Sequence, residues 1–324
     1  MPERHRVLVT RRLPAAVEAA LRERFDVTLS PHDTATTAAE LQGALGQADG
    51  LLSTVTDRIT AEVLAAYPLR TRIIANFGVG YDNIDLAAAQ AHDIVVTNTP
   101  DVLTDCTADL AMMLVLMAMR RAGEGERELR AGTWAGWRPT HMIGRRVTGT
   151  TLGLVGMGRI ARAVAHRAHH GFGMRVLCYD PSPPSPVALA ALGAEPRATL
   201  EALLGESDVV SLHCPSTPAT RGMINDARLA QMQPGSFLIN TARGDIVIDD
   251  ALIAALRSGH LAGAGLDVYR GEPRLERRYL ELENVVLLPH LGSATQETRD
   301  AMGLRAVANL TAFFDGKPVP DRVA

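Results

Sequence analysis

The chain has 324 residues, of which 47% are hydrophobic and 21% charged, and its formal net charge is −3. This length exceeds what one hydrophobic core usually serves, so two domains are expected, and the composition is typical of a globular enzyme. The weak negative charge argues against a nucleic-acid partner, because phosphate binding needs a concentrated basic face. No apolar signal core follows Met1, and the longest apolar run, Leu110–Met119, suits a buried helix better than a membrane span. We therefore expect a cytoplasmic protein that does not bind membranes.

Two residue types narrow the chemistry further. Lys317 is the only lysine in the sequence, which excludes Schiff-base chemistry, a P-loop lysine and the Tyr-x-x-x-Lys pair of short-chain dehydrogenases. Any catalytic cation must therefore be arginine or histidine. The cysteines are far apart and have no metal-ligand spacing, so no metal site and no disulfide framework are expected; they are Cys106, Cys178 and Cys214.

In the first third of the chain, short β-branched runs alternate with helical stretches, as in βαβ units with a parallel sheet. Helices are predicted at Pro14–Arg24 and Thr60–Ala66. The strands are predicted at Arg6–Thr10, Asp26–Leu29, Gly50–Ser53, Arg72–Asn76 and Ile94–Thr97. No glycine-rich phosphate loop occurs in this part of the sequence.

A long apolar helix, Thr104–Arg121, is predicted to leave the first domain, and an irregular stretch that includes Gly123, Gly132, Trp134 and Pro139 follows it. A second series of strands then begins. These strands are predicted at Thr151–Val155, Arg175–Asp180, Asp208–His213, Ser236–Asn240, Ala262–Asp267 and Val285–Leu288, with a proline-rich loop at Pro181–Pro186. The last helix, Ala294–Phe314, comes too late to complete a domain alone, so we expect it to return to the first domain.

A glycine pattern, Gly156-x-Gly158-x-x-Ala161, follows the strand at Thr151–Val155 and opens a helix. The first glycine permits a tight turn, the second lets the backbone approach a pyrophosphate, and a small third residue allows close packing of helix on strand. Such a pattern also occurs in ordinary turns. The next strand, however, ends in Asp180, close to the spacing of about twenty residues expected for the acid that binds an adenosine ribose. Asp180 would favour NAD over NADP, because its charge repels a 2′-phosphate.

Three further segments carry groups suited to the reduction of a 2-keto acid. Arg243 comes just after a strand, where open α/β sheets bind ligands, and a guanidinium binds a carboxylate through two hydrogen bonds. His290 also follows a short strand and could exchange a proton near neutral pH. Glu272, in Gly271-Glu-Pro273, could stabilise its protonated ring. Taken one by one, a loop arginine, a glutamate before proline and a lone histidine are each more often surface residues.

Together these motifs resemble the D-isomer-specific 2-hydroxy-acid dehydrogenases, and in particular the glyoxylate/hydroxypyruvate reductase branch. The segments that carry the resemblance are Asn76–Asp85, Val96–Asp105, the glycine loop, Asn240–Asp245, Gly271–Pro273 and Pro289–Thr295. The resemblance implies two doubly wound parallel-sheet α/β domains, with a Rossmann cofactor domain inserted into a flavodoxin-like substrate domain. It places the substrate domain at 1–99 and 289–324, and the NAD-binding domain at 100–288 with a dimerisation arm at about 122–145. Ala161 departs from the family pattern, where the third residue is commonly glycine.

The resemblance also implies roles for individual residues. Arg243 would bind the substrate, Glu272 would pair with His290, and His290 would be the general acid/base. The substrate would further contact the Val79 and Gly80 amides, Ser293, and Trp137 from the partner subunit of a homodimer. The cofactor, NAD in preference to NADP, would contact Gly156, Met157, Gly158, Arg159, Ile160, Asp180, Cys214, Pro215, Thr241, Ala242, Asp267 and Gly292.

The expected reaction is therefore the reduction of a small 2-keto acid, glyoxylate or hydroxypyruvate, to the D-2-hydroxy acid. Phosphoglycerate dehydrogenase or another D-2-hydroxy-acid dehydrogenase is the alternative within the family. Phosphite oxidation by relatives uses a lysine in the segment that aligns with Val79-Gly80-Tyr81, and this chain has none there. Outside the enzymes, a nicotinamide-sensing co-repressor is the alternative, against which the complete Arg243, Glu272 and His290 set argues.

Overall fold

The computed structural model describes residues 4–31, 33–65 and 68–324. Its internal contacts divide the chain into two units. Unit 1 comprises Met1–Leu103 and Ala294–Ala324, and unit 2 comprises Thr104–Ser293. The domain boundaries predicted from the sequence, at 99/100 and 288/289, lie a few residues before the boundaries between these units, at 103/104 and 293/294.

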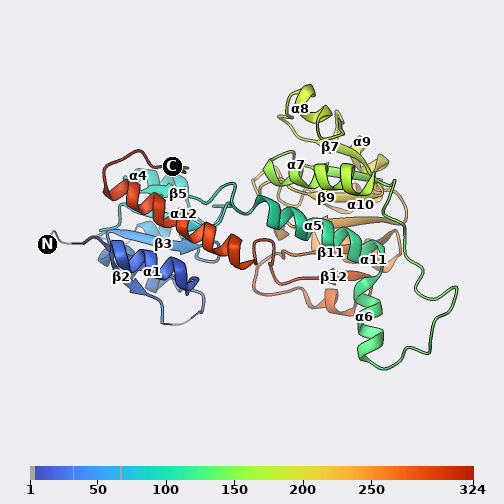
Figure 1. The fold of residues 1–324 in the computed structure, drawn as a ribbon, viewed down its shortest axis with the longest axis horizontal. Coiled ribbons are helices and arrows are strands. Elements are labelled where there is room, and N and C mark those ends of the chain that lie inside the picture. Colours follow the sequence, from blue (N-terminus) through green and yellow to red (C-terminus); the bar gives the residue numbers. More distant parts are fainter. Residues whose placement is uncertain (1–3, 32, 66–67) are drawn as a thin grey trace. The chain divides into compact units, whose positions relative to one another are not determined.

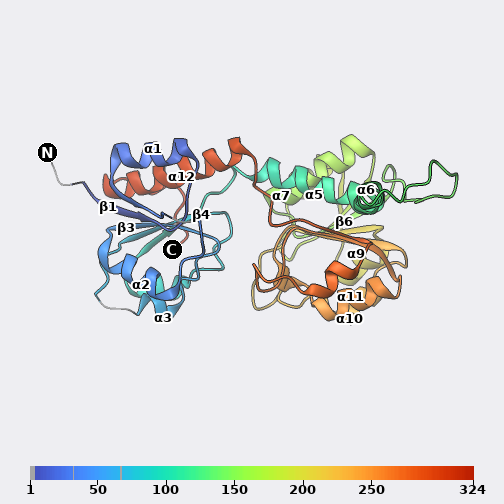
Figure 2. The same ribbon diagram turned by 90° about the horizontal axis from the view of Figure 1, so that it is seen from below.

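Unit 1 is a five-stranded parallel sheet with helices on both faces (Figures 1 and 2). The strand order is β2-β1-β3-β4-β5, which is the flavodoxin-like order. Its strands are β1 (Arg6–Val9), β2 (Asp26–Leu29), β3 (Gly50–Thr54), β4 (Ile73–Phe77) and β5 (Val95–Thr97). Its helices are α1 (Ala15–Arg24), α2 (Ala38–Gln47), α3 (Ala61–Leu64), α4 (Leu86–Ala91) and α12 (Gln296–Phe314).

The helices of unit 1 begin where side chains can satisfy their free amide groups. Thr37 and Glu40 form a capping box at α2, and Asp85 and Thr295 accept hydrogen bonds from the first turns of α4 and α12. Helices α1 and α12 cover one face of the sheet, and α2 and α3 cover the other (Figure 2). The helix at the end of the sequence thus packs against α1 and β4 of the first part of the chain.

Unit 2 contains a seven-stranded parallel sheet with the order β12-β11-β10-β9-β6-β7-β8, which is a Rossmann arrangement extended by one strand. Its strands are β6 (Thr151–Val155), β7 (Arg175–Tyr179), β8 (Ala194–Pro196), β9 (Val209–Leu212), β10 (Ser236–Asn240), β11 (Leu261–Leu266) and β12 (Val285–Leu287). Its α-helices are α5 (Thr104–Met119), α6 (Ala122–Arg130), α7 (Arg159–His166), α8 (Pro186–Ala190), α9 (Leu200–Glu206), α10 (Asp226–Gln231) and α11 (Asp249–Arg257). A π-helical turn, Arg167–Gly171, extends α7, and short 3-10 helices lie at Gly244–Ile246 and Arg277–Glu281.

Two apolar layers sandwich this sheet. One forms between the sheet and helices α5 and α7, and the other forms between the sheet and helices α9, α10 and α11. Figure 2 shows these two groups of helices on opposite faces of the sheet. Because all strands run parallel, the loops after β6, β7, β9, β10, β11 and β12 gather at one edge of the sheet. That edge therefore collects the glycine loop, Asp180, Arg243, Asp267 and His290.

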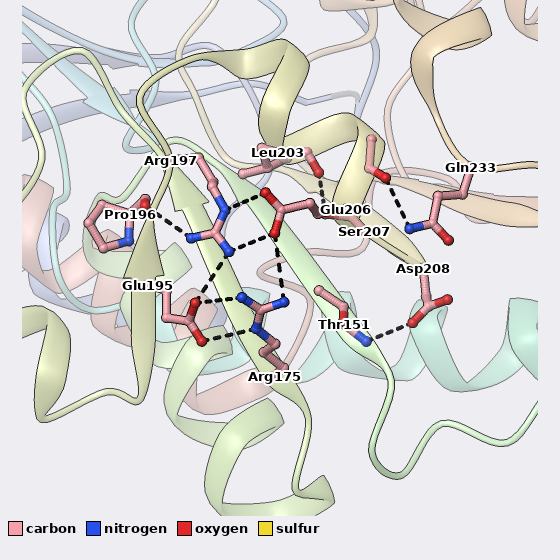
Figure 3. Close-up of polar contacts among 11 residues, drawn as sticks. Thr151, Arg175, Glu195, Pro196, Arg197, Leu203, Glu206, Ser207, Asp208 and Gln233 are labelled. Atoms are coloured by element: carbon pink, nitrogen blue, oxygen red, sulfur yellow. Dashed lines mark hydrogen bonds and ion pairs between the residues drawn. The ribbon is translucent and has the colours of Figure 1, made fainter.

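The strands predicted from the sequence agree with the structure to within one residue at each end, but strand β8 was not predicted, and helix α6 lies where irregular structure was expected. Strand β8 is an edge strand of three residues that ends in Pro196, too short and polar to show a strand pattern. Ion pairs hold it in place: Arg175 binds Glu195 at 2.7 Å, and Arg197 bridges Glu195 and Glu206 (Figure 3).

Helix α6 replaces the start of the stretch for which the sequence indicated irregular structure. Its two glycines, Gly123 and Gly125, hide the helical pattern, whereas ion pairs one turn apart support it, as between Arg121 and Glu124 at 2.6 Å. The preceding helix ends at Met119 rather than at Arg121. The helix predicted at Thr60–Ala66 corresponds to α3, but its last predicted residue lies outside the described residues.

Candidate active site

A tight glycine turn joins β6 to α7. Gly156 has a φ of +92°, and a Cβ built on it would lie 2.9 Å from the backbone of His213 and Cys214, so no side chain fits there. Gly158 is the N-cap of α7, no side chain caps this helix, and the space beside Gly158 is open. The free amide groups of the first turn of α7 are thus available to a phosphate.

Asp180 lies directly after β7 and faces this turn. One carboxylate oxygen accepts a hydrogen bond from the Met157 N–H at 2.7 Å, and the other accepts one from the Ser182 N–H at 2.8 Å. Each carboxylate oxygen can accept a second hydrogen bond, so the group can still bind ligand hydroxyls. The turn lies between β6 and β9, where the strand order reverses and where such sheets bind dinucleotides. The residues present therefore fit a dinucleotide.

The other residues predicted to contact the cofactor lie on neighbouring loops. Cys214 follows β9, and burial together with the charge of Asp180 raises the pKa of its thiol to about 11, so the thiol stays protonated. Thr241 follows β10, and its hydroxyl is buried with no hydrogen-bond partner among the described residues. Of the remainder, the Met157 side chain is buried, Ile160 and Ala242 are half-buried, and Arg159 and Pro215 are exposed.

Glu272 and His290 form a hydrogen-bonded pair at the carboxyl ends of β11 and β12. The His290 Nδ1 lies 2.8 Å from Glu272 Oε2, and the other oxygen of Glu272 accepts a hydrogen bond from the Tyr269 N–H at 2.8 Å. Burial opposes ionisation of Glu272, but His290, the Tyr269 N–H and the charge of Arg243 together outweigh it and lower the pKa of the carboxyl. Glu272 is therefore ionised at neutral pH and stabilises a protonated imidazole.

The backbone of His290 has an unusual conformation, with a φ of +57°. Asp267, which is 1% exposed, stabilises this conformation. Its carboxylate accepts hydrogen bonds from the Leu291 N–H at 2.7 Å and the Gly292 N–H at 2.8 Å. Its main-chain oxygen also accepts the His290 N–H at 2.9 Å. Burial raises the pKa of Asp267, against the opposing effect of these amides and of His290. Asp267 was predicted as a cofactor ligand, and in this structure it anchors the loop that carries His290.

Arg243 lies on the loop after β10 and is half-buried. Asn240, which is 1% exposed, shapes that loop, since its side chain donates to the Arg243 carbonyl at 2.9 Å and accepts from the Ala242 N–H at 3.0 Å. Gly244 then brings the loop against the backbone of Tyr269, where a Cβ on Gly244 would have no room. The segments that carry Arg243 and Glu272 are thereby packed against each other.

Three residues near this site received no role from the sequence. They are Asn240, Tyr269 and Thr107. The Thr107 hydroxyl donates a hydrogen bond to the Gly292 carbonyl at 2.9 Å. Burial raises the pKa of the Tyr269 hydroxyl, which donates to the carbonyl oxygens of Leu266 at 3.0 Å and Leu288 at 2.8 Å. Asn240 was recognisable as part of a motif, whereas Thr107 and Tyr269 act through partners that lie far from them in the sequence, Gly292 and Leu288.

The remaining predicted residues lie elsewhere. Val79 and Gly80 belong to unit 1, in the turn after β4, and Ser293 is the last residue of unit 2. Trp137 is 81% exposed, on the long loop between α6 and β6 that stands away from the rest of unit 2 (Figure 1). Among the described residues, no cluster of histidine, cysteine or acidic side chains is suited to a metal ion, and no helix is both long and apolar enough to span a membrane.

Comparisons with known proteins show the family to which the chain belongs. The family model for the NAD binding domain of the D-isomer specific 2-hydroxyacid dehydrogenases matches residues 112–292, all within unit 2. Glyoxylate reductase from Thermococcus kodakarensis is 45% identical over 99% of this chain and 96% of its own length. Glycerate dehydrogenase from Hyphomicrobium methylovorum is 38% identical over 96% of both chains.

A solved structure is similar over nearly the whole chain. The NADPH-dependent glyoxylate/hydroxypyruvate reductase from Sinorhizobium meliloti, in complex with NADP and malonate, has a TM-score of 0.87 and 36% identity. The match covers 99% of this chain and 97% of that one. The fold, the strand-end residues and these likenesses lead to one assignment: the chain belongs to the D-isomer-specific 2-hydroxyacid dehydrogenases and is an NAD(P)-dependent oxidoreductase.

Proposed function

We propose that this enzyme reduces glyoxylate or hydroxypyruvate, yielding glycolate or D-glycerate, and that NADH is its preferred reductant. The observation that carries the proposal is the hydrogen bond of 2.8 Å between His290 and Glu272, on loops adjoining the one that bears Arg243. The names of the relatives, glyoxylate reductase and glycerate dehydrogenase, support the choice of substrates. They do not favour phosphoglycerate, and the His290–Glu272 pair supports an enzyme over a co-repressor.

In this proposal each group has a separate task. When bound, the reduced nicotinamide supplies the hydride. Arg243 binds the substrate through its guanidinium, and the Val79 and Gly80 amides of unit 1 bind the substrate carboxylate. Because Glu272 occupies Nδ1 of His290, Nε2 is the nitrogen left to donate a proton to the carbonyl oxygen as it becomes a hydroxyl. In the oxidative direction the neutral ring takes that proton back, so the two directions should have opposite pH preferences.

The direct test is the loss of NADH absorbance with a panel of 2-keto acids. Glyoxylate and hydroxypyruvate should give the highest kcat/KM, and bulky 2-keto acids should give lower values. A wild-type enzyme that oxidises NADH with none of them would refute the proposal.

The preference for NADH is proposed from Asp180. Hydrogen bonds from two ribose hydroxyls to a carboxylate are worth about 1.5–3 kcal/mol each, and a 2′-phosphate would lose them and meet a like charge. We expect kcat/KM to be higher with NADH than with NADPH by orders of magnitude. Asp180→Ala should narrow that ratio mainly by harming NADH use, and Ser182→Arg should begin to favour NADPH. Equal efficiency of the two cofactors with the wild type would contradict the assignment.

We further propose a homodimer in which Trp137 reaches the neighbouring subunit's substrate site. Four large apolar side chains are exposed on α6 and the loop after it: Leu129 at 62%, Trp134 at 50%, Trp137 at 81% and Ile143 at 66%. Such a group of exposed apolar residues is typical of an interaction surface. Trp137→Ala should change substrate preference more than NADH affinity, and a fully active monomer in sedimentation would contradict the dimer.

A further inference from the structure

The turn after β4, Gly78–Tyr81, has three consecutive carbonyl groups directed into unit 1. The Gly78 oxygen accepts a hydrogen bond from the Thr99 N–H at 3.0 Å. The Val79 oxygen accepts one from Asn98 Nδ2 at 2.9 Å, and the Gly80 oxygen accepts one from Asn76 Nδ2 at 2.8 Å. Asn76 lies in β4, and Asn98 and Thr99 directly follow β5, the neighbouring strand of the sheet.

The direction of these carbonyls determines the direction of the amides. A trans peptide is planar and its N–H and C=O groups point opposite ways, so an inward carbonyl turns the next N–H outward. The amides of Val79, Gly80 and Tyr81 therefore all point away from Asn76 and Asn98. Among the hydrogen bonds of the described residues, none uses these three amides as donors. Successive amides that face one way form a nest for an anion.

The two asparagine side chains that hold the turn are themselves fixed. Asn76 is fully buried and Asn98 is 8% exposed. An acceptor oxygen placed against a carbonyl would be repelled, so each side chain must present its NH2 group to the turn. The backbone of Asn98 is tied to the C-terminal segment, because its N–H donates to the Asp321 carbonyl at 3.2 Å and its oxygen accepts from Asn309 Nδ2 at 3.3 Å.

The turn is also closely packed on the side of Gly78. A Cβ built on Gly78 would lie less than 3.0 Å from the Val55 side chain, so the turn is packed against the segment after β3. Without the two side-chain donors, the half-buried Val79 and Gly80 carbonyls would lack these partners, and the peptide groups that carry the Gly80 and Tyr81 amides would no longer be held in place. A carbonyl that is partly shielded from water and has no partner costs free energy, which favours a shift of these peptide groups and of the amides they carry.

We propose that Asn76 and Asn98 are positioning residues that aim the Gly80 and Tyr81 amides at the substrate carboxylate, beside the Val79 amide, whose peptide is held by the Thr99 N–H. The inference rests on the proposed function, in which the Val79 and Gly80 amides bind that carboxylate. It adds Tyr81 as a third donor and identifies the side chains that orient the Gly80 and Tyr81 amides. In this proposal the two asparagines do not touch the substrate, and they act on its binding through the turn that they hold. They have no part in cofactor binding or proton transfer.

The test compares Asn76→Leu and Asn98→Leu, which keep the approximate shape of the side chain but remove the donor, with Thr71→Val. Thr71 is the matched control: it is 3% exposed, lies before the start of β4, and donates to the Ala48 carbonyl at 2.9 Å, far along the strand from the turn. The measurements are KM and kcat for the 2-keto acid, inhibition by oxamate (a non-reducible carboxylate analogue of these acids), the Kd of NADH and Tm.

Both leucine variants should raise KM and the oxamate inhibition constant about tenfold or more, with kcat and the NADH Kd nearly unchanged. Asn98→Asp should have at least as large an effect, because a carboxylate would repel both the Val79 carbonyl and the substrate. Thr71→Val should lower Tm without changing KM. If Asn76→Leu fails to fold, Asn98→Leu, at the less buried position, decides the matter.

Two results would overturn the proposal: KM and oxamate inhibition unchanged in a folded leucine variant, or NADH binding weakened in parallel with substrate binding. Failure of the proposed function would look different, since the wild type itself would then reduce no 2-keto acid. In that case calorimetric titration of oxamate still tests the turn. If Asn98→Leu binds oxamate more weakly than the wild type does, the inference is supported. Equal oxamate affinities would refute it.

Discussion

Replacing Gly244 by alanine should disable the site without touching a charged group. Gly244 follows Arg243 and is buried against the segment that leads to Glu272. A Cβ at this position would lie less than 3.0 Å from the carbonyl carbon and oxygen of Tyr269 and from the nitrogen of Arg270. All three are backbone atoms, so no side-chain rotation can relieve the overlap, and the two segments must move apart.

The size of the effect follows from that separation. Carbon atoms in contact lie about 3.5 Å or more apart, so the segments must separate by more than roughly 1 Å. Overpacking of this kind costs about 1–3 kcal/mol, which for a chain of this size lowers Tm by several degrees. A displacement of about 1 Å in an active site can cost about a hundredfold in rate. We therefore expect kcat/KM for the 2-keto acid to fall roughly ten- to a hundredfold.

The assay is steady-state NADH oxidation well below Tm, so that the folded enzyme is measured, together with Tm and the Kd of NADH. The matched control is Gly205→Ala in α9, where an added Cβ meets only the Gln231 oxygen at an ordinary 3.8 Å. That variant should keep wild-type kinetics. Wild-type kcat/KM for folded Gly244→Ala would refute the view that Gly244 sets the placement of Arg243 against Glu272.

Three further predictions concern charged residues. Arg243→Lys keeps the charge but loses the guanidinium fork, so kcat/KM should fall about ten- to a hundredfold, and near-wild-type kinetics would remove Arg243 from the site. Glu272→Gln removes the anion that stabilises protonated His290, so reduction should decline at a lower pH than in the wild type, and an unmoved pH–rate profile would contradict the pair. Glu195, beside Arg175, has its pKa lowered from 4.5 to about 2, so the stability it contributes is present above pH 4.5 and is lost as the pH falls towards 2 (Figure 3). Glu195→Gln should therefore lower Tm at neutral pH by a small amount, because the Arg175–Glu195 pair is half-exposed. The difference in Tm between the variant and the wild type should become smaller as the pH is lowered. A Tm difference that does not depend on pH would refute this prediction.

Much of this protein was already determined by local sequence. All strands except β8, and several of the helices, followed from the spacing of apolar residues. The glycine pattern with Asp180 indicated a dinucleotide site because turn geometry depends on only a few consecutive residues. The ends of strands also indicated the positions of Arg243, Glu272 and His290. In a parallel sheet all carboxyl ends meet at one edge, so knowing the strands is enough to expect these residues close together.

Only the tertiary structure decided which atoms hold the reacting groups in place. Asp267 uses its carboxylate for amides 24 and 25 residues away, and Asn98 reaches a carbonyl 19 residues away. Nothing in the local sequence specifies such partners, because chain segments distant in sequence must first be brought together by the sheet. For the same reason β8 escaped prediction: its three residues have little strand character of their own, and pairing with β7 and the ion pairs of Arg175 and Arg197 make them a strand.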